Sequence, residues 1–237
     1  MYALKDATNN SPMRFKARLV YKNHPFANTS TWDEVFAPVV DKSTLRIFFT
    51  LVGRKGLKMR QADVITAYLN AEMTDEVFVK LPTSCGDEPG MVRQLLKTLY
   101  GHLKVGQLWN QKFAQFMTTQ GFIQSERDKC FFYNLKAEFF LVLYVDDLIA
   151  AALHVKQLNR FWGQLQSVFK VRDMGEPKHF LGMEISHIFQ HGLVAISQRR
   201  YVEKLAKRFE LPDTERPLTP IRTDHYERLT ASADEPI

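Results

Sequence analysis

The order of apolar and polar residues along the chain predicts a mixture of β-strands and amphipathic helices. Apolar residues recur at helical spacing in three segments, 41–53, 107–121 and 155–170. The first two segments end at glycines, as helices often do. Residues 57–64 have the pattern of a core strand, and residues 129–153 contain two or three strands interrupted by a pair of aspartates.

The rest of the chain has a less regular pattern. A short basic strand is predicted within 15–23, and three short strands and a last helix are predicted between 169 and 210. Strands and helices that do not alternate strictly favour the α+β class. We expect residues 1–13 to be loose and residues 212–237 to form a polar tail or linker, so the globular region is predicted to cover 14–211.

The composition of the 237 residues is that of a globular protein, with 45% hydrophobic and 24% charged residues. The formal net charge of +6 suits a polyanionic partner, although solvated basic surfaces are common. The two cysteines lie far apart, so neither a zinc motif nor a disulfide framework is predicted. No segment has the roughly 18 apolar residues of a membrane span, and the N-terminus has no signal-peptide core. We therefore expect an intracellular protein without a membrane partner.

The aspartate pair Asp146 and Asp147 lies inside an apolar run from Phe139 to Leu153. A carboxylate in apolar surroundings is strongly disfavoured, so the pair either reaches water in a turn or faces a cation. Aspartate is common in turns, but Asp-Asp fits a hairpin tip less well than Asn-Gly or Asp-Gly. Asp63 ends the other core strand, where it is either a turn or cap residue or a third ligand. Aspartates on neighbouring strands can share two metal ions about 3.5–4 Å apart, the arrangement used for phosphoryl transfer.

Seven short motifs then occur in an order and at a spacing that resemble one family. They are KARLV (16–20), FAPVV (36–40), QADVITAYLNAEM (61–73), LYG (99–101), LYVDDLI (143–149), FLGMEI (180–185) and ISQRRY (196–201). Together they resemble the reverse transcriptase of copia-type long-terminal-repeat retrotransposons, in which YVDD is the active-site box. The resemblance implies an RNA-directed DNA polymerase domain of a Pol polyprotein. Its fold would be an α+β palm, with an antiparallel sheet and helices on one face, plus partial fingers.

The resemblance also implies roles for individual residues. Asp63, Asp146 and Asp147 match the catalytic aspartates. Asp63 and Asp146, with the backbone carbonyl of Val64, would bind two Mg²⁺ ions, for which Mn²⁺ is a substitute. Tyr68 matches the aromatic residue beneath the incoming sugar, although a core aromatic residue would give the same pattern.

The remaining implied roles concern basic residues and one turn. Lys16 and Arg18 match positions that hold the triphosphate, where a guanidinium fork suits phosphate oxygens, or they belong to a solvated basic strand. Lys104 stands where the family has a glutamine against the nucleotide. Phe180, Leu181 and Gly182 match the turn that positions the primer end. Lys178 is either the proton donor to pyrophosphate or an ordinary surface lysine.

The expected partners are an RNA or DNA template with its primer, deoxynucleoside triphosphates and the rest of the Pol polyprotein, including integrase and ribonuclease H. Three departures from the family pattern matter. The segment LYGHLKVGQLW replaces the family's LYGLKQAP. The chain is also expected to be a fragment, with an incomplete fingers sheet at its N-terminus and without the thumb-like region and ribonuclease H at its C-terminus. They favour an alternative, a catalytically degenerate remnant that still binds nucleic acid. A different palm-fold phosphotransferase, such as a nucleotidyl cyclase, has no reason to carry FAPVV or FLGMEI.

Overall fold

The computed structural model describes residues 2–5, 14–22, 37–82, 85–86, 88, 90–188 and 192–211. The predicted tail at 212–237 and most of the segment 1–13 lie outside these ranges. Residues 2–5 form strand β1 (Tyr2–Lys5), which pairs antiparallel with β2 (Arg14–Ala17), in place of the loose segment expected there. This pairing gives the backbone N–H and C=O groups of the strand hydrogen-bond partners on β2. The pattern of apolar and polar residues did not indicate such a partner.

The chain divides into two compact units. The larger unit holds residues up to Lys178 together with Ile185–Ala195, and the smaller unit holds His179–Glu184 and the residues from Ile196 onward. The larger unit contains the main sheet and three of the helices described below, so it carries the candidate site.

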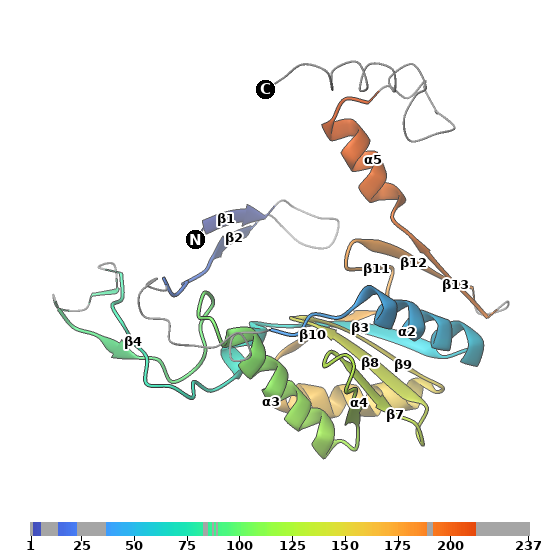
Figure 1. Cartoon of the computed structure of the whole chain (residues 1–237), viewed down its shortest axis with the longest axis horizontal. Helices are drawn as coiled ribbons and strands as arrows, with labels where there is room; N and C mark the ends of the chain where they lie inside the picture. Colours follow the sequence, from blue (N-terminus) through green and yellow to red (C-terminus); the bar gives the residue numbers. More distant parts are fainter. Residues whose placement is uncertain are drawn as a thin grey trace, which may run out of the picture. The chain divides into compact units, whose positions relative to one another are not determined.

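The main sheet has six antiparallel strands in the order β10-β3-β9-β8-β7-β6. The strands are β3 (Lys58–Val64), β6 (Ile123–Gln124), β7 (Phe131–Asn134), β8 (Phe139–Tyr144), β9 (Asp147–Ala152) and β10 (Val171–Gly175). Strands β6 to β9 follow one another along the chain, whereas β3 and β10 join the sheet from distant parts of the sequence (Figure 1). This antiparallel sheet with its helices confirms the predicted α+β class.

Helices α3 (Val105–Thr119) and α4 (Val155–Val168) cover one face of the sheet. Successive residues of a strand point to opposite faces, so alternate residues such as Ala62, Leu141 and Ala150 join this core. The helices and the segment after α4 contribute a cluster of aromatic rings: Trp109, Phe113, Phe116, Phe161, Trp162 and Phe169. All of these ring residues are buried.

Helix α2 (Lys42–Lys55) covers the opposite face, so the prediction that the helices lie on one face was wrong. The physical reason is that β8 and β9 are apolar on both sides, which leaves a second face that must also be shielded from water. The buried side chains on that face include Phe140, Val142 and Ile149. Helix α2 contributes Phe48, which is fully buried.

The ends of α2 show which residues set its length. Asp41 is the N-cap, and its carboxylate accepts a hydrogen bond from the Ser43 backbone N–H at 2.6 Å. The helix runs past Gly53, where the sequence pattern placed its end, and stops at Gly56 with a φ of 60°. Only glycine adopts this left-handed conformation without cost, so Gly56 is the natural terminator. Lys55, in the last turn, forms an ion pair with Glu138 between β7 and β8.

The smaller elements of the larger unit are the 3-10 helix η2 (Ala67–Asn70) and the hairpin of β4 (Phe78–Val79) with β5 (Arg93–Gln94). A second sheet has the order β11-β12-β13, formed by β11 (His179–Phe180), β12 (Met183–Ile188) and β13 (Leu193–Ser197). Helix α5 (Arg199–Arg208) belongs to the smaller unit, and none of its residues is buried. Across the described ranges, every helix is too short or too polar to cross a bilayer.

Candidate active site

The turn between β8 and β9 consists of Val145 and Asp146, so Asp147 is the first residue of β9. Val145 has a φ of 56°, which is costly for a β-branched residue. Two hydrogen bonds hold this strained backbone. The Trp109 indole N–H donates to the Val145 carbonyl oxygen at 2.7 Å, and the Val64 backbone N–H donates to the Asp146 carbonyl oxygen at 2.7 Å. The turn is therefore locked from α3 on one side and from β3 on the other.

A row of charged and polar residues crosses the sheet beside this turn. Asp147 lies opposite Tyr144 on β8 and opposite Asp63 on β3, and Asp63 lies opposite Arg172 on β10. Directly opposite residues point to the same face, and like charges placed this way repel. The sequence predicted that the three aspartates meet. The structure refines that prediction, since the cross-strand partner of Asp63 is Asp147 and Asp146 joins them from the turn.

The electrostatics of the site reflect a local excess of negative charge. The pKa of Asp147 is raised to about 6, first by burial and then by repulsion from Asp146 and Asp63. Burial followed by the Asp146 charge also raises the pKa values of the phenols of Tyr68 and Tyr100. Each of these shifts would diminish if a cation neutralised the carboxylates. The site therefore has the electrostatic character of a cation-binding site.

A cavity of about 550 Å³ opens onto the aspartates. Its walls include Asp63, Val64, Asp146, Asp147, Arg18, Tyr100 and Arg172. This volume falls within the usual range for small-molecule sites. The guanidinium of Arg18 lies 5.7 Å from the centre of the Tyr100 ring, so one predicted triphosphate ligand reaches the same cavity as the aspartates. The cavity thus combines carboxylates and guanidinium groups.

The two tyrosines near the cavity have different positions. Tyr68 is half-buried on η2, and its ring packs against the Tyr100 ring with centroids 5.1 Å apart. Tyr100 lines the cavity, whereas the η2 residue that lines it is Leu69. Tyr68 therefore supports the wall that Tyr100 forms. Tyr100 belongs to the motif LYG, and the sequence alone assigned it no role.

Two of the predicted basic residues, Lys104 and Lys178, do not line the cavity. Lys104 precedes α3, and its ammonium group lies 2.9 Å from the Asp75 carboxylate, whose pKa it lowers. Lys178 is exposed, and its backbone carbonyl oxygen accepts a hydrogen bond from Ile185. The side chain of Lys16 lies outside what the structure describes. Arg172 on β10 does line the cavity, and the sequence alone did not single it out.

The predicted primer-positioning residues belong to the smaller unit. Phe180 is buried, and Leu181 and Gly182 form the turn between β11 and β12 with φ values of 49° and 77°. The turn itself is as predicted, and its role toward a primer stays a prediction.

The residues present fit a hard cation such as Mg²⁺. Carboxylate and carbonyl oxygens are its preferred ligands, and Mg²⁺ is commonly held by one or two carboxylates plus substrate phosphates. Within the described ranges, no group of three or more aspartate, glutamate, cysteine or histidine side chains is placed so that it could hold a metal ion by itself. A site completed by substrate phosphates needs no such group, and Asp63, Asp146 and the Val64 carbonyl have the required chemistry.

A family model described as reverse transcriptase (RNA-dependent DNA polymerase) matches residues 1–223, so the chain belongs to the reverse transcriptase family. Its relatives are Pol polyproteins of copia-type transposons, which confirms the resemblance seen in the motifs. The chain is 29% identical to the retrovirus-related Pol polyprotein from transposon TNT 1-94 of Nicotiana tabacum over 226 residues, covering 93% of this chain. It is 30% identical to that from transposon RE1 of Arabidopsis thaliana over 223 residues, covering 92% of this chain.

The chain spans only a small part of these relatives, 17% of the tobacco protein and 15% of the Arabidopsis protein. A putative transposon Ty5-1 protein of Saccharomyces cerevisiae is 29% identical over 163 residues, which are 67% of this chain and 53% of that protein. The similarity therefore covers one region of each large polyprotein.

Proposed function

We propose that this chain is the RNA-directed DNA polymerase region of a copia-type Pol polyprotein, with a palm and part of the fingers. It would add deoxynucleotides to the 3′ end of a primer by two-metal phosphoryl transfer. The observation that carries this proposal is the meeting of Asp63, Asp146 and Asp147 at a cavity that also contains arginines. Membership of the reverse transcriptase family supports it.

Each side chain at the site would have its own role in the reaction. Asp63 and Asp146 would hold two Mg²⁺ ions, or Mn²⁺ in their place, with the Val64 carbonyl as a further ligand. When bound, the metal pair supplies Lewis-acid activation of the primer hydroxyl and charge stabilisation at the phosphates. Asp147 keeps the local charge negative, which favours cation binding. Arg18 would orient the triphosphate, because its planar fork matches phosphate oxygens.

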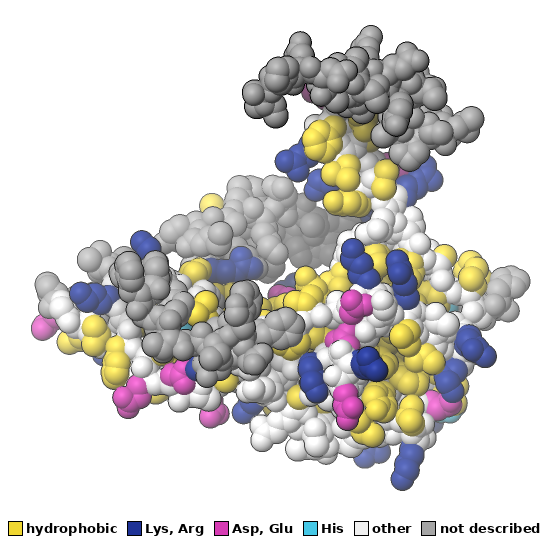
Figure 2. All heavy atoms as spheres, in the orientation of Figure 1, with side chains coloured by type: hydrophobic (Ala, Val, Ile, Leu, Met, Phe, Trp, Pro, Cys, Tyr) yellow, Lys and Arg dark blue, Asp and Glu magenta, His cyan; other side chains and the backbone are white. Residues whose placement is uncertain are grey.

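The proposed partners are an RNA or DNA template with its primer, deoxynucleoside triphosphates, and the integrase and ribonuclease H regions of the polyprotein. On the face shown in Figure 2, the Lys and Arg side chains of the described residues lie scattered among acidic and apolar ones. With a net charge of +6, this distribution supports a small number of phosphate contacts. Binding to primer–template should therefore be weak and should fall steeply with added salt.

A second candidate is a catalytically degenerate remnant that still binds nucleic acid. It is favoured by one observation at the position of the family's glutamine. Lys104 stands there and pairs with Asp75 at 2.9 Å instead of lining the cavity. If the family's glutamine is needed to place the nucleotide, this chain would bind primer–template and extend it poorly.

Primer extension with aspartate variants tests the first candidate. We expect Asp63→Asn and Asp146→Asn to reduce Mg²⁺-dependent extension about a thousandfold, because metal-held charge stabilisation is worth several kcal/mol. Glu126→Gln, which removes an exposed carboxylate elsewhere, is the matched control and should extend normally. Equal activity in the aspartate and control variants would overturn the proposal.

Lys104→Gln separates the two candidates. The remnant hypothesis predicts weak extension by the unmodified chain and a gain of about tenfold or more in this variant. Replacing residues 102–107, HLKVGQ, by LKQAPR, which restores the family's LYGLKQAP, would confuse the result because it puts proline in place of Gly106. A Cβ at Gly106 would lie 2.4 Å from the Ala37 Cβ, a severe clash. Robust extension by the unmodified chain would exclude the remnant hypothesis.

A further inference from the structure

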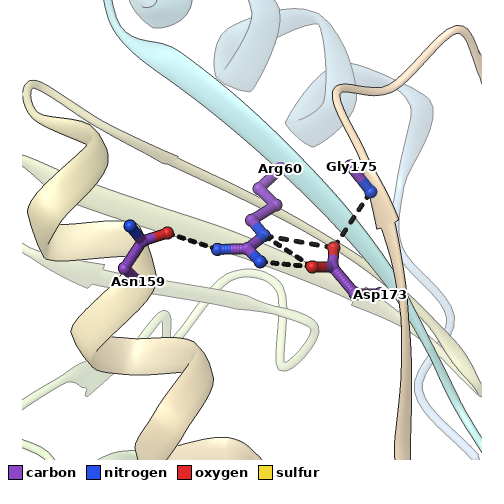
Figure 3. Close-up of polar contacts among 4 residues, drawn as sticks. All are labelled: Arg60, Asn159, Asp173 and Gly175. Atoms are coloured by element: carbon purple, nitrogen blue, oxygen red, sulfur yellow. Dashed lines mark hydrogen bonds and ion pairs between the residues drawn. The ribbon is translucent and has the colours of Figure 1, made fainter.

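Strand β10 carries different chemistry on its two sides. On the side of α4, the Asp173 carboxylate receives a fork of hydrogen bonds from Arg60 on β3, with the Nε of Arg60 3.1 Å from both carboxylate oxygens. Figure 3 shows the Arg60 guanidinium between Asp173 and Asn159, whose side-chain oxygen lies 2.6 Å from Nη1. The guanidinium also lies 5.0 Å from the centre of the Trp162 ring. Arg60 is therefore held from β10 and from α4.

Asp173 also fixes the local path of the strand. Its carboxylate accepts a hydrogen bond from the Gly175 backbone N–H at 2.9 Å, and the pairing of β10 with β3 shifts register between these two residues. Gly175 has a φ of 71°, a conformation that suits glycine. Hydrogen bonds from Arg60 hold the pKa of Asp173 below its usual value, so the carboxylate is charged at neutral pH. One side chain thus ties β10 to β3 and shapes its irregular end.

The residue before Asp173 points the other way. Arg172 lies opposite Asp63, lines the cavity and has a side chain that is 53% exposed. Its Nη1 is 3.9 Å from the nearer Asp63 carboxylate oxygen, at the outer limit of an ion pair and beyond hydrogen-bond distance. Exposed pairs of this kind are weak. The guanidinium is therefore able to turn to a more highly charged anion in the same cavity.

The cavity has charges of both signs, which suggests what kind of ligand it takes. Three carboxylates line the cavity at one end of the sheet. Arg18, which follows β2, and Arg172, on β10, line the same cavity. A ligand that contributes both divalent cations and phosphate oxygens would match both groups. Cations would neutralise the aspartates, and the guanidinium forks would then bind phosphate oxygens in bidentate fashion.

We propose that Arg172 binds the pyrophosphate portion of the nucleotide, and that Arg60 and Asp173 are positioning residues that aim Arg172 into the cavity. The inference rests on the proposed polymerase function, since that reaction brings a triphosphate to the aspartates. Arg172 acts by direct contact. Arg60 and Asp173 act through β10, because a strand held on one face keeps the residue on its other face in register.

Isothermal titration of the whole chain with inorganic pyrophosphate and Mg²⁺ tests the contact without requiring catalysis. We expect Arg172→Gln to weaken pyrophosphate binding about tenfold, the lower range for a hydrogen bond to a charged group. Arg160→Gln removes the same charge from an exposed position on α4 and should leave the affinity unchanged. Failure of the unmodified chain to bind pyrophosphate, or equal affinity of the Arg172→Gln and unmodified chains, would overturn the assignment.

A double-variant cycle tests the positioning role. Asp173→Asn should weaken pyrophosphate binding by about threefold, and it should have no further effect once Arg172 is glutamine. Additive effects would show that Asp173 supports the fold generally and would overturn its positioning role. If thermal melts show that Asp173→Asn is unfolded, Arg60→Lys replaces it in the cycle, because lysine keeps the positive charge but lacks the guanidinium fork. Arg60→Lys should also have no effect on pyrophosphate binding in the Arg172→Gln background.

Primer extension, measured in parallel, separates this inference from the proposed function. Arg172-dependent pyrophosphate binding by a chain that extends no primer would contradict the polymerase proposal and support the assignment of Arg172. Extension together with pyrophosphate binding that does not depend on Arg172 would support the polymerase proposal and overturn the assignment.

Discussion

The sheet face that carries Asp63 and Asp147 differs sharply between its two ends. At one end, Ile149 and its neighbours are buried, and α2 packs over them with Phe48 fully buried. At the other end, two residues along β9 from Ile149, Asp147 opens onto the cavity. This separation is about 7 Å along a strand. The surface therefore changes from sealed and apolar to open and charged within one repeat of the pleat.

The contrast shows how the fold tolerates an unfavourable cluster of charge. Three carboxylates near one another and a valine with positive φ each cost stability at the open end. The sealed end and the aromatic core on the other face supply the packing that offsets this cost. Such an arrangement would keep the proposed cation site rigid although its carboxylates repel one another.

Phe48→Ala would break the sealed end and should have the largest effect. Truncating a buried phenylalanine typically costs about 3–5 kcal/mol of the free energy of unfolding. Ile47→Ala is the matched control on the same helix, since Ile47 is 56% exposed and should cost less than about 0.5 kcal/mol. Urea denaturation of both variants measures the difference. Similar costs for the two would mean that α2 does not seal this face.

Trp109→Phe would remove one of the hydrogen bonds that hold the turn at the open end. The phenyl ring still fills much of the site, but the hydrogen bond to the Val145 carbonyl is lost, so we expect a cost of about 2 kcal/mol. Val145→Gly removes the conformational strain of the turn. If the hydrogen bond serves to hold that strain, Trp109→Phe should cost less in the Val145→Gly background. An identical cost in both backgrounds would show that Trp109 only packs.

Asp147→Asn should have a smaller, pH-dependent effect at the open end. The folded-state pKa of about 6 lies above the usual 3.8, so the folded chain binds a proton more tightly than the unfolded chain. Stability is then lost as pH rises from about 4 to 6, and the variant avoids this loss. In metal-free buffer it should melt roughly 2 °C higher than the unmodified chain at pH 8 and at a similar temperature at pH 4.

The opposite sign is expected for Asp173→Asn. The pKa of Asp173 is lowered by Arg60, so its contribution to stability is present at neutral pH and is lost as pH falls through the acidic range. This variant should therefore melt below the unmodified chain at pH 7, and the difference should shrink near pH 3. The same direction of change in both aspartate variants would contradict this account of the electrostatics.

Local patterns predicted much of this structure from the sequence. The helical spacing in 155–170 and the apolar run around Asp146 depend on neighbouring residues, and both gave the correct element. Sites that depend on long-range pairing were less accessible. Nothing in the letters FKVRDMG shows that Arg172 lies opposite Asp63, because that register is set by strands far apart in the chain.

The sequence also did not show which helix covers which face of the sheet. The pattern of β8 and β9 indicated only that both faces of these strands are apolar. The predicted roles of Tyr68 and Lys104 show a similar limit, since one lies behind Tyr100 and the other pairs with Asp75. Composition identifies a residue that is capable of a role. Its distance from the cavity depends on packing that the motif does not contain.

The strand order also has a consequence for how the protein folds. Strands β6 to β9 are consecutive and joined by short connections, so their contacts are local and should form early. Strand β3 pairs with β9 only after the whole intervening segment, including α3, has closed into a loop, which is entropically slower. Asp146 and Asp147 therefore belong to the early-forming meander, and Asp63 arrives with the late pairing. We expect the three aspartates of the proposed cation site to come together only at a late stage of folding, when β3 pairs with β9.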